Sequence, residues 1–142
     1  MRLRLLTVPA ALAAAVLAAG CTSAPSNDAA GDYQGTEKEI AEVVDDLSAA
    51  AVDGDSKEIC DTIFAPELAD RLTQDGSDCQ DALDDQLSDV TDGDIDVTSI
   101  DVTGDRATAQ VVSPFAGDDR QQTLSFVRDG NAWRISGLEP AS

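Results

Sequence analysis

The sequence predicts an α+β domain in which N-terminal helices pack on one face of a four-stranded antiparallel sheet. Up to about residue 90, apolar residues recur every three to four positions, which is the period of an amphipathic helix. After residue 97 they alternate with polar residues, and short glycine-containing turns separate the alternating runs, as in strands. Helices that precede strands without mixing indicate the α+β class, and 142 residues is the length of one domain.

The first twenty residues have the three parts of a secretory signal peptide. Two arginines make a basic start, an uncharged apolar run follows over residues 5–17, and small residues lead to Cys21. The alternative, a membrane-spanning helix, needs about 20 apolar residues, whereas this run is shorter and contains Pro9. We therefore expect residues 1–20 to be a signal peptide and the protein to be exported.

The end of that segment, Leu17-Ala18-Ala19-Gly20-Cys21, resembles the lipobox of bacterial lipoproteins, in which the cysteine becomes the acylated N-terminus. Ala18 stands three places before the cysteine, where the family usually has a larger aliphatic residue. The alternative, an ordinary secreted thiol, leaves an odd cysteine among three, whereas acylation of Cys21 leaves an even pair. The resemblance implies a protein anchored through Cys21 to the outer face of the cell membrane.

Residues 21–35 hold almost no large apolar side chains. Such a stretch buries too little surface to offset the conformational entropy that is lost when a chain becomes ordered. We expect a flexible tether over residues 21–35 and the α+β domain over residues 36–142.

The first predicted helix begins at Thr36, which has with Glu39 the spacing of a capping box. It ends at Asp53-Gly54-Asp55, a composition that stops a helix. Its apolar stripe consists of Ile40, Val43, Val44, Leu47 and Ala51.

Three shorter helices follow. One starts near Ser56, the next has Pro66 in its first turn, and the last begins with a second capping box of Ser77 and Gln80 and continues to Val90.

Cys60 and Cys79 fall on two of these helices among apolar neighbours. In an exported domain the default for such a pair is a disulfide, and a loop of this size gives about 3 kcal/mol of stabilisation. A two-cysteine metal site is the alternative, but the CxxC spacing and histidine are both missing. A redox-active pair is normally close in sequence. We predict a structural disulfide.

Four alternating runs then predict an antiparallel meander, joined by turns that contain Gly104, Gly117 and Gly130. Trp133 falls on the alternating pattern of the last run, so we interpret it as a core anchor. In the four runs the residues that share one face are Thr98, Ile100 and Val102, then Ala107, Ala109 and Val111, then Leu124 and Phe126, and last Trp133 and Ile135.

Three segments carry a likeness to a known group: Asp53 to Cys60, Val102 to Ala107, and Trp133 to Leu138. With the helices-first order they resemble the nuclear-transport-factor-2-like fold, a cone that ketosteroid isomerases and SnoaL-type cyclases also use. The small secreted and lipoprotein members from actinobacteria are the most similar. The resemblance implies a curved sheet and a cavity between sheet and helices. It does not by itself imply a chemistry.

The composition argues against catalysis and against nucleic acid. The chain has no histidine and a formal net charge of −19, which repels phosphate backbones. Enzymes of the fold commonly use a pocket Asp–His or Asp–Tyr pair, and the one tyrosine, Tyr33, lies in the predicted tether. A lone buried carboxylate would be the remaining base. We predict a non-catalytic protein without a cofactor.

A calcium loop is the strongest metal candidate, at Asp92, Asp94 and Asp96. Counted from Asp92, however, the positions that need glycine and glutamate in an EF-hand are Val97 and Thr103. We therefore predict no metal site.

Three function classes remain open, of which an enzyme of the ketosteroid-isomerase-like fold ranks below two non-catalytic functions. The small inward residues Ala107 and Ala109 suit a cavity for a small apolar ligand, but helix side chains can fill the same space. The first function is that of a lipid-anchored extracytoplasmic domain that binds a small apolar ligand or an envelope component. The alternative is an accessory lipoprotein that contacts other proteins through its surface.

Overall fold

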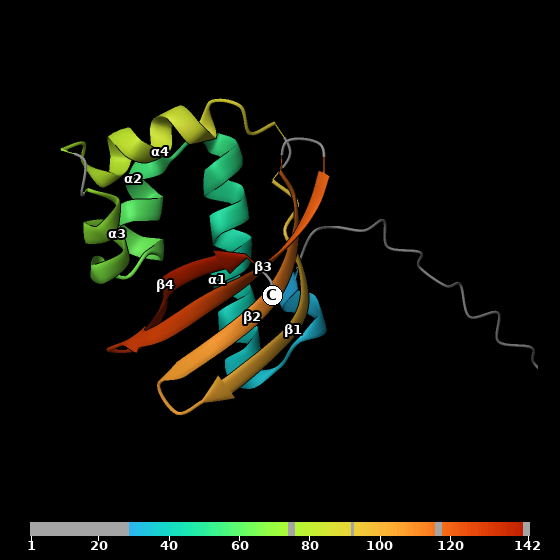
Figure 1. Cartoon of the computed structure of the whole chain (residues 1–142). Coiled ribbons are helices and arrows are strands. Elements are labelled where there is room, and N and C mark those ends of the chain that lie inside the picture. The colour runs from blue at the N-terminus through green and yellow to red at the C-terminus, as the bar shows by residue number, and fades with distance from the viewer. Residues whose placement is uncertain (1–28, 74–75, 92, 116–117, 141–142) are drawn as a thin grey trace, which may run out of the picture.

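The computed structural model of the chain describes residues 29–73, 76–91, 93–115 and 118–140. A layer of helices covers one face of a four-stranded antiparallel sheet, which confirms the α+β class (Figure 1). The predicted signal peptide and Cys21 lie outside the described residues. The elements are the 3-10 helix η1 (Ala29–Asp32), α1 (Gly35–Asp53), α2 (Ser56–Glu58), the π-helix η2 (Ile59–Ile63), α3 (Pro66–Leu72), α4 (Cys79–Leu87), β1 (Asp96–Thr103), β2 (Arg106–Phe115), β3 (Asp118–Asp129) and β4 (Ala132–Pro140).

The long helix α1 crosses the sheet and buries one face against it (Figure 1). Gly54 ends the helix as predicted, because its φ of 67° belongs to the left-handed region that glycine adopts without strain. The buried residues of α1 are Ile40, Ala41, Val44, Leu47 and Ala50.

The predicted capping box at the start of α1 is wrong. The helix begins at Gly35, and the residue before it, Gln34, makes no side-chain capping hydrogen bond. The carboxylate of Glu39 instead accepts the indole N–H of Trp133 at 3.2 Å. Since Trp133 lies on β4, Glu39 forms a tertiary hydrogen bond in place of the local one that the capping box predicted.

A π-helix follows α2 where the sequence predicted an ordinary helix. Its marker is the bond from the Phe64 N–H to the Ile59 carbonyl, five residues back, at 2.8 Å. The wider turn places four apolar residues on one side of the segment. All four are buried: Ile59, Cys60, Ile63 and Phe64.

The last helix, α4, differs from the prediction at both ends. Its cap is Asp78, whose side chain accepts the Asp81 N–H at 2.9 Å, and not Ser77. It ends at Leu87 rather than at Val90.

The strands run in the order β1-β2-β3-β4, each antiparallel to the next, as predicted for a meander. Gly104 and Gly130 have the positive φ values, 62° and 63°, that tight hairpin turns require. The third predicted turn includes residues 116–117, which lie outside the described residues.

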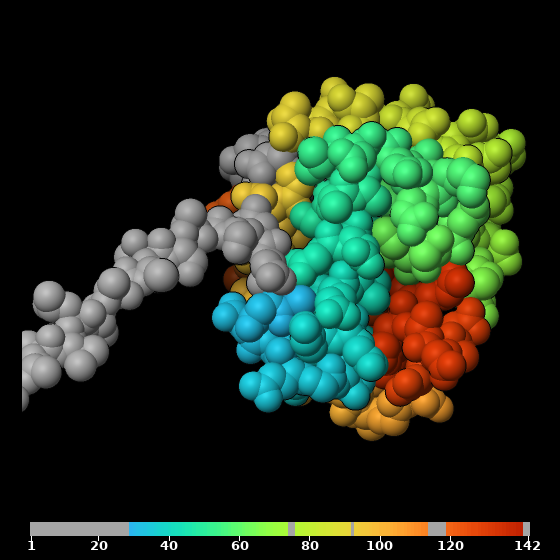
Figure 2. Space-filling model, turned by 180° about the vertical axis from the view of Figure 1, so that it is seen from behind, coloured from blue at the N-terminus to red at the C-terminus, as the bar shows by residue number. Residues whose placement is uncertain are grey.

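The N-terminal boundary also differs from the prediction, because residues before position 36 already pack against the core. The Asp45 carboxylate of α1 accepts the N–H groups of Ala29 and Ala30 at 3.0 and 3.1 Å, and Ala30 is buried. Figure 2 shows this first segment, in blue, lying against α1. Tyr33 also packs against the core, so the last residues of the tether predicted over residues 21–35, from Ala29 on, belong to the folded domain.

Candidate functional site

The interior between sheet and helices is occupied by side chains. Ala107 and Ala109 are buried at 4% and 0% exposure, and they belong to one core cluster with Ile40 and Val44 of α1. The register places Ala109 between Ile100 and Leu124, which are also buried. The largest fully buried side chains are Phe126, Ile40, Ile59, Leu124, Ile135, Val44 and Val111.

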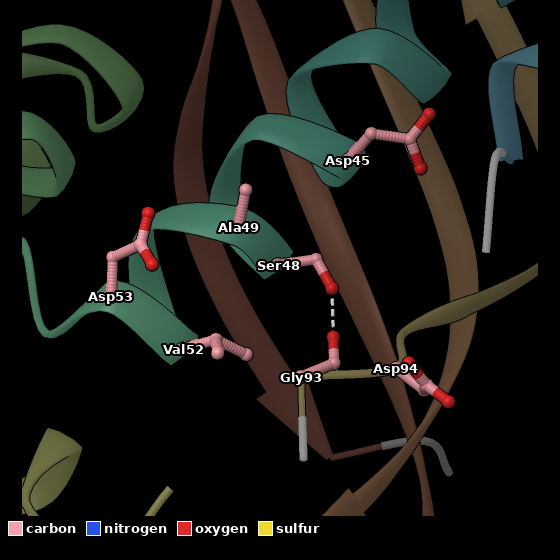
Figure 3. Close-up of a pocket in the computed structure, with 7 residues that line it drawn as sticks. All are labelled: Asp45, Ser48, Ala49, Val52, Asp53, Gly93 and Asp94. Atoms are coloured by element: carbon pink, nitrogen blue, oxygen red, sulfur yellow. Dashed lines mark hydrogen bonds between the residues drawn. The ribbon is translucent and has the colours of Figure 1, made fainter. Parts of the chain in front are cut away.

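Two hollows of the described surface lie along α1. One has a volume of about 300 Å³ and separates α1 from the segment before β1 (Figure 3). A second, of about 260 Å³, lies where η1 meets α1. The first is lined by Asp45, Ser48, Ala49, Val52, Asp53, Gly93 and Asp94. The second is lined by Ala30, Gly31, Lys38, Glu42, Asp45 and Asp46.

The first hollow is shallow because the chain is pinned across it. The Ser48 hydroxyl donates a hydrogen bond to the Gly93 carbonyl, as Figure 3 shows. The carboxylates that line the hollow lie apart from one another in this view, and Asp45 already holds the amides of η1. Val52 adds apolar surface and is 50% exposed. The geometry is that of a packed seam between two segments.

Gly93 makes the seam possible. A Cβ at this position would collide with the Val52 side chain and would lie 2.8 Å from the Ser48 carbonyl oxygen. The backbone oxygen cannot move without moving α1, so the approach of the two segments requires glycine.

Replacing Gly93 with alanine is expected to lower the free energy of unfolding by about 1–3 kcal/mol, since the seam must open to admit the methyl group. Urea unfolding measures the change. Gly137→Ala is the matched control, because its new Cβ would lie 3.6 Å from the Ser125 Cβ, an ordinary contact. If the two variants are equally stable, the seam is not tightly packed.

The residues considered for catalysis are not brought together. Tyr33 packs against the core, and burial raises its pKa, with the carboxylates of Asp32 and Glu37 adding to the effect. In the part of the chain that the structure describes, the buried polar residues are Ser56 and Ser113, so no carboxylate has the burial that makes a lone base.

The described residues contain no group of three or more histidine, cysteine or acidic side chains placed to hold a metal ion. Of the three calcium candidates, Asp94 lines the first hollow and Asp96 is exposed at the start of β1. Asp92 lies outside the described residues.

The structure has the predicted disulfide between Cys60 and Cys79, with a Cα–Cα distance of 6.1 Å. Both cysteines are buried, at 8% and 7% exposure. The bond joins η2 to the first residue of α4, so it ties the last helix to the rest of the helical layer.

Contacts that the sequence analysis missed hold the helices to β4. Trp133 is buried at 4% exposure, as predicted. Its indole N–H donates to the Glu39 carboxylate, and the Arg128 guanidinium lies over the ring, with its carbon 5.7 Å from the ring centroid. Arg134 donates to the carbonyls of Asp61 at 2.8 Å and Phe64 at 3.3 Å. Glu39 and Arg134 look like ordinary surface charges in the sequence, because these partners are 70 or more positions away.

Within the described residues, no helix has the length and hydrophobicity required to cross a membrane. In comparisons with known proteins, no family model matches the chain and no curated protein sequence matches it.

Proposed function

We propose that this protein is a non-catalytic, lipid-anchored extracytoplasmic accessory domain that acts on an envelope component through its surface. The observation that carries the proposal is the filled interior. The alanines that would have opened a cavity are buried in the same cluster as the apolar face of α1. A domain with such a core offers its outer faces to a partner.

The charge of the helical layer indicates the kind of partner. The acidic side chains of α1 and α4 that are exposed include Glu37, Glu42, Asp46, Asp53, Asp81, Asp84 and Asp85. The layer's basic residues are already engaged: Lys38 pairs with Glu42, Lys57 pairs with Asp61, and Arg71 donates to the Ser136 carbonyl. A surface of this kind attracts basic partners and repels phosphate.

The proposal includes the finer fold, a nuclear-transport-factor-2-like cone. Its support is the helices-first order and the position of α1 across one face of a four-stranded meander (Figure 1). It also includes the anchor at Cys21, supported by the lipobox-like segment. Seven residues separate Cys21 from Ala29, and they span at most about 25 Å, so the anchor would hold the domain close to the membrane.

Replacing Cys21 with serine is expected to move the protein out of the membrane fraction or to leave it unprocessed, because the acylated thiol is the attachment. Fractionation with immunoblotting measures both outcomes. Cys79→Ser is the control, since it removes a cysteine without touching the anchor. A mature-sized Cys21→Ser protein that still sediments with membranes would contradict the anchor.

Replacing Ala109 with leucine tests the filled interior. We expect the free energy of unfolding to fall by about 1–3 kcal/mol, because three added carbons have no space to enter. Thr108→Leu is the matched control, since Thr108 is exposed, on the opposite face of the same strand. A neutral or stabilising Ala109→Leu, or an apolar molecule retained in native mass spectrometry, would favour the small-ligand function instead.

A further inference from the structure

The helix α4 lies over α2 and α3 in the helical layer (Figure 1). Its one buried residue is Cys79. Leu83 and Leu87 are half-buried against the core, and the acids of the helix are exposed. Apart from the disulfide, the apolar contacts of α4 with the core are therefore those of the half-buried Leu83 and Leu87.

The sequence of α4 also gives the helix little stability of its own. Nine residues are below the length at which an isolated helix is stable. Asp81 faces Asp84 and Asp85 at spacings of three and four residues, where like charges repel. The last turn carries no basic residue, although the helix dipole favours a cation there. The Asp78 cap is the main local contribution in favour of the helix.

The other half of the disulfide is held independently. The segment around η2 is attached to β4 by the Ala65 N–H, which donates to the Ile135 carbonyl at 2.7 Å, and by Arg134, which donates to the Asp61 carbonyl. The Arg71 side chain of α3 donates to the Ser136 carbonyl at 2.5 Å. None of these contacts involves α4.

We propose that the Cys60–Cys79 disulfide is a redox-controlled clasp. Reduction releases α4 and exposes Leu83 and Leu87, while α1 and the sheet stay folded. The inference goes beyond the proposed function and does not depend on the lipid anchor.

The releasing reaction needs a dithiol reductant. Its thiolate attacks one sulfur of the disulfide, forms a mixed disulfide and displaces the other sulfur as a thiolate, which takes up a proton. The second thiol of the reductant then displaces the protein cysteine and closes a disulfide in the reductant. The two protein cysteines gain two electrons and two protons, and the reductant loses the same number.

Hydrogen–deuterium exchange on the purified full-length chain in detergent, before and after treatment with dithiothreitol, tests the clasp. In the reduced protein we expect the α4 amides to exchange within about tenfold of the rate of an unstructured chain. Amides of β2 and β3 should remain at least about a hundredfold slower than that rate. The double variant Cys60→Ala, Cys79→Ala should show the exposed α4 without reductant and no response to it.

A second variant separates helix release from general weakening. Asp84→Lys removes a repulsion and places a cation in the last turn of α4, so exchange at α4 in the reduced protein should slow by about two- to fivefold. The proposal is overturned if α4 keeps its protection after reduction. It is also overturned if β2 and β3 lose protection together with α4.

Discussion

Replacing Phe126 with alanine is expected to lower the free energy of unfolding by about 3–5 kcal/mol. Phe126 is 1% exposed, and the register of β3 places it beside Ala107 of β2 and Ile135 of β4. Those strands are fixed by their ladders, so the core cannot collapse into the space that the ring leaves. Urea unfolding followed by far-ultraviolet circular dichroism measures the loss.

Val52→Ala is the matched control for this substitution. Val52 is an apolar residue that is 50% exposed, so its truncation should change the free energy of unfolding by about 0.5 kcal/mol or less. A loss below about 1 kcal/mol for Phe126→Ala would mean that the core around the ring is already loosely packed. The filled-interior argument for a surface function would then fail.

Replacing Cys60 with serine is expected to lower the free energy of unfolding by about 3 kcal/mol, because the unfolded chain regains the entropy of a loop of 19 residues. The single tryptophan is the probe. Trp133 is buried at 4% exposure on β4, far along the chain from both cysteines, so its fluorescence reports the unfolding of the sheet core.

Reductant supplies the control for the disulfide. Added dithiothreitol should lower the stability of the wild type and leave that of Cys60→Ser unchanged. In the variant, Cys79 should react with a thiol reagent that does not modify either cysteine of the oxidised wild type. Two reactive thiols at these positions in the untreated exported protein would show that the bridge is absent in solution.

The stability prediction for the disulfide and the clasp proposal are tested separately. The stability change concerns the whole domain and follows from the loop entropy of the unfolded chain. The exchange experiment concerns where the reduced chain opens first, which depends on the few buried residues of α4. If reduction lowers the free energy of unfolding by about 3 kcal/mol but all elements lose protection together, the stability prediction is confirmed and the clasp proposal is contradicted.

Several elements could be predicted because their causes are local. Gly54, Gly104 and Gly130 adopt the positive φ that few other residues accept, so the C-terminal end of α1 and two hairpin turns lie where the sequence predicted them. The alternation in β2 and β3 is likewise local, because successive side chains of a strand point to opposite faces. The packed residues Ala107, Leu124 and Phe126 follow that alternation.

Other features depended on partners that are distant in sequence. Glu39 has the spacing of a capping box with Thr36, but it bonds instead to Trp133. Asp45 looks like one more surface acid of α1, yet it binds the backbone of η1 and extends the domain to Ala29. Glu39 had a local partner in the predicted capping box, but the fold brings the indole of Trp133 within hydrogen-bonding distance.

The sequence by itself determined the α+β class, the order of helices and strands, the cysteine pair and the excess of acid, because composition and periodicity set all of these along the chain. Only the tertiary structure decided that side chains fill the space over Ala107 and Ala109, and that Gly93 closes a seam against Ser48. Volume and close approach are properties of residues brought together from different elements. A one-dimensional pattern shows which residues face inward, but not how much room they leave.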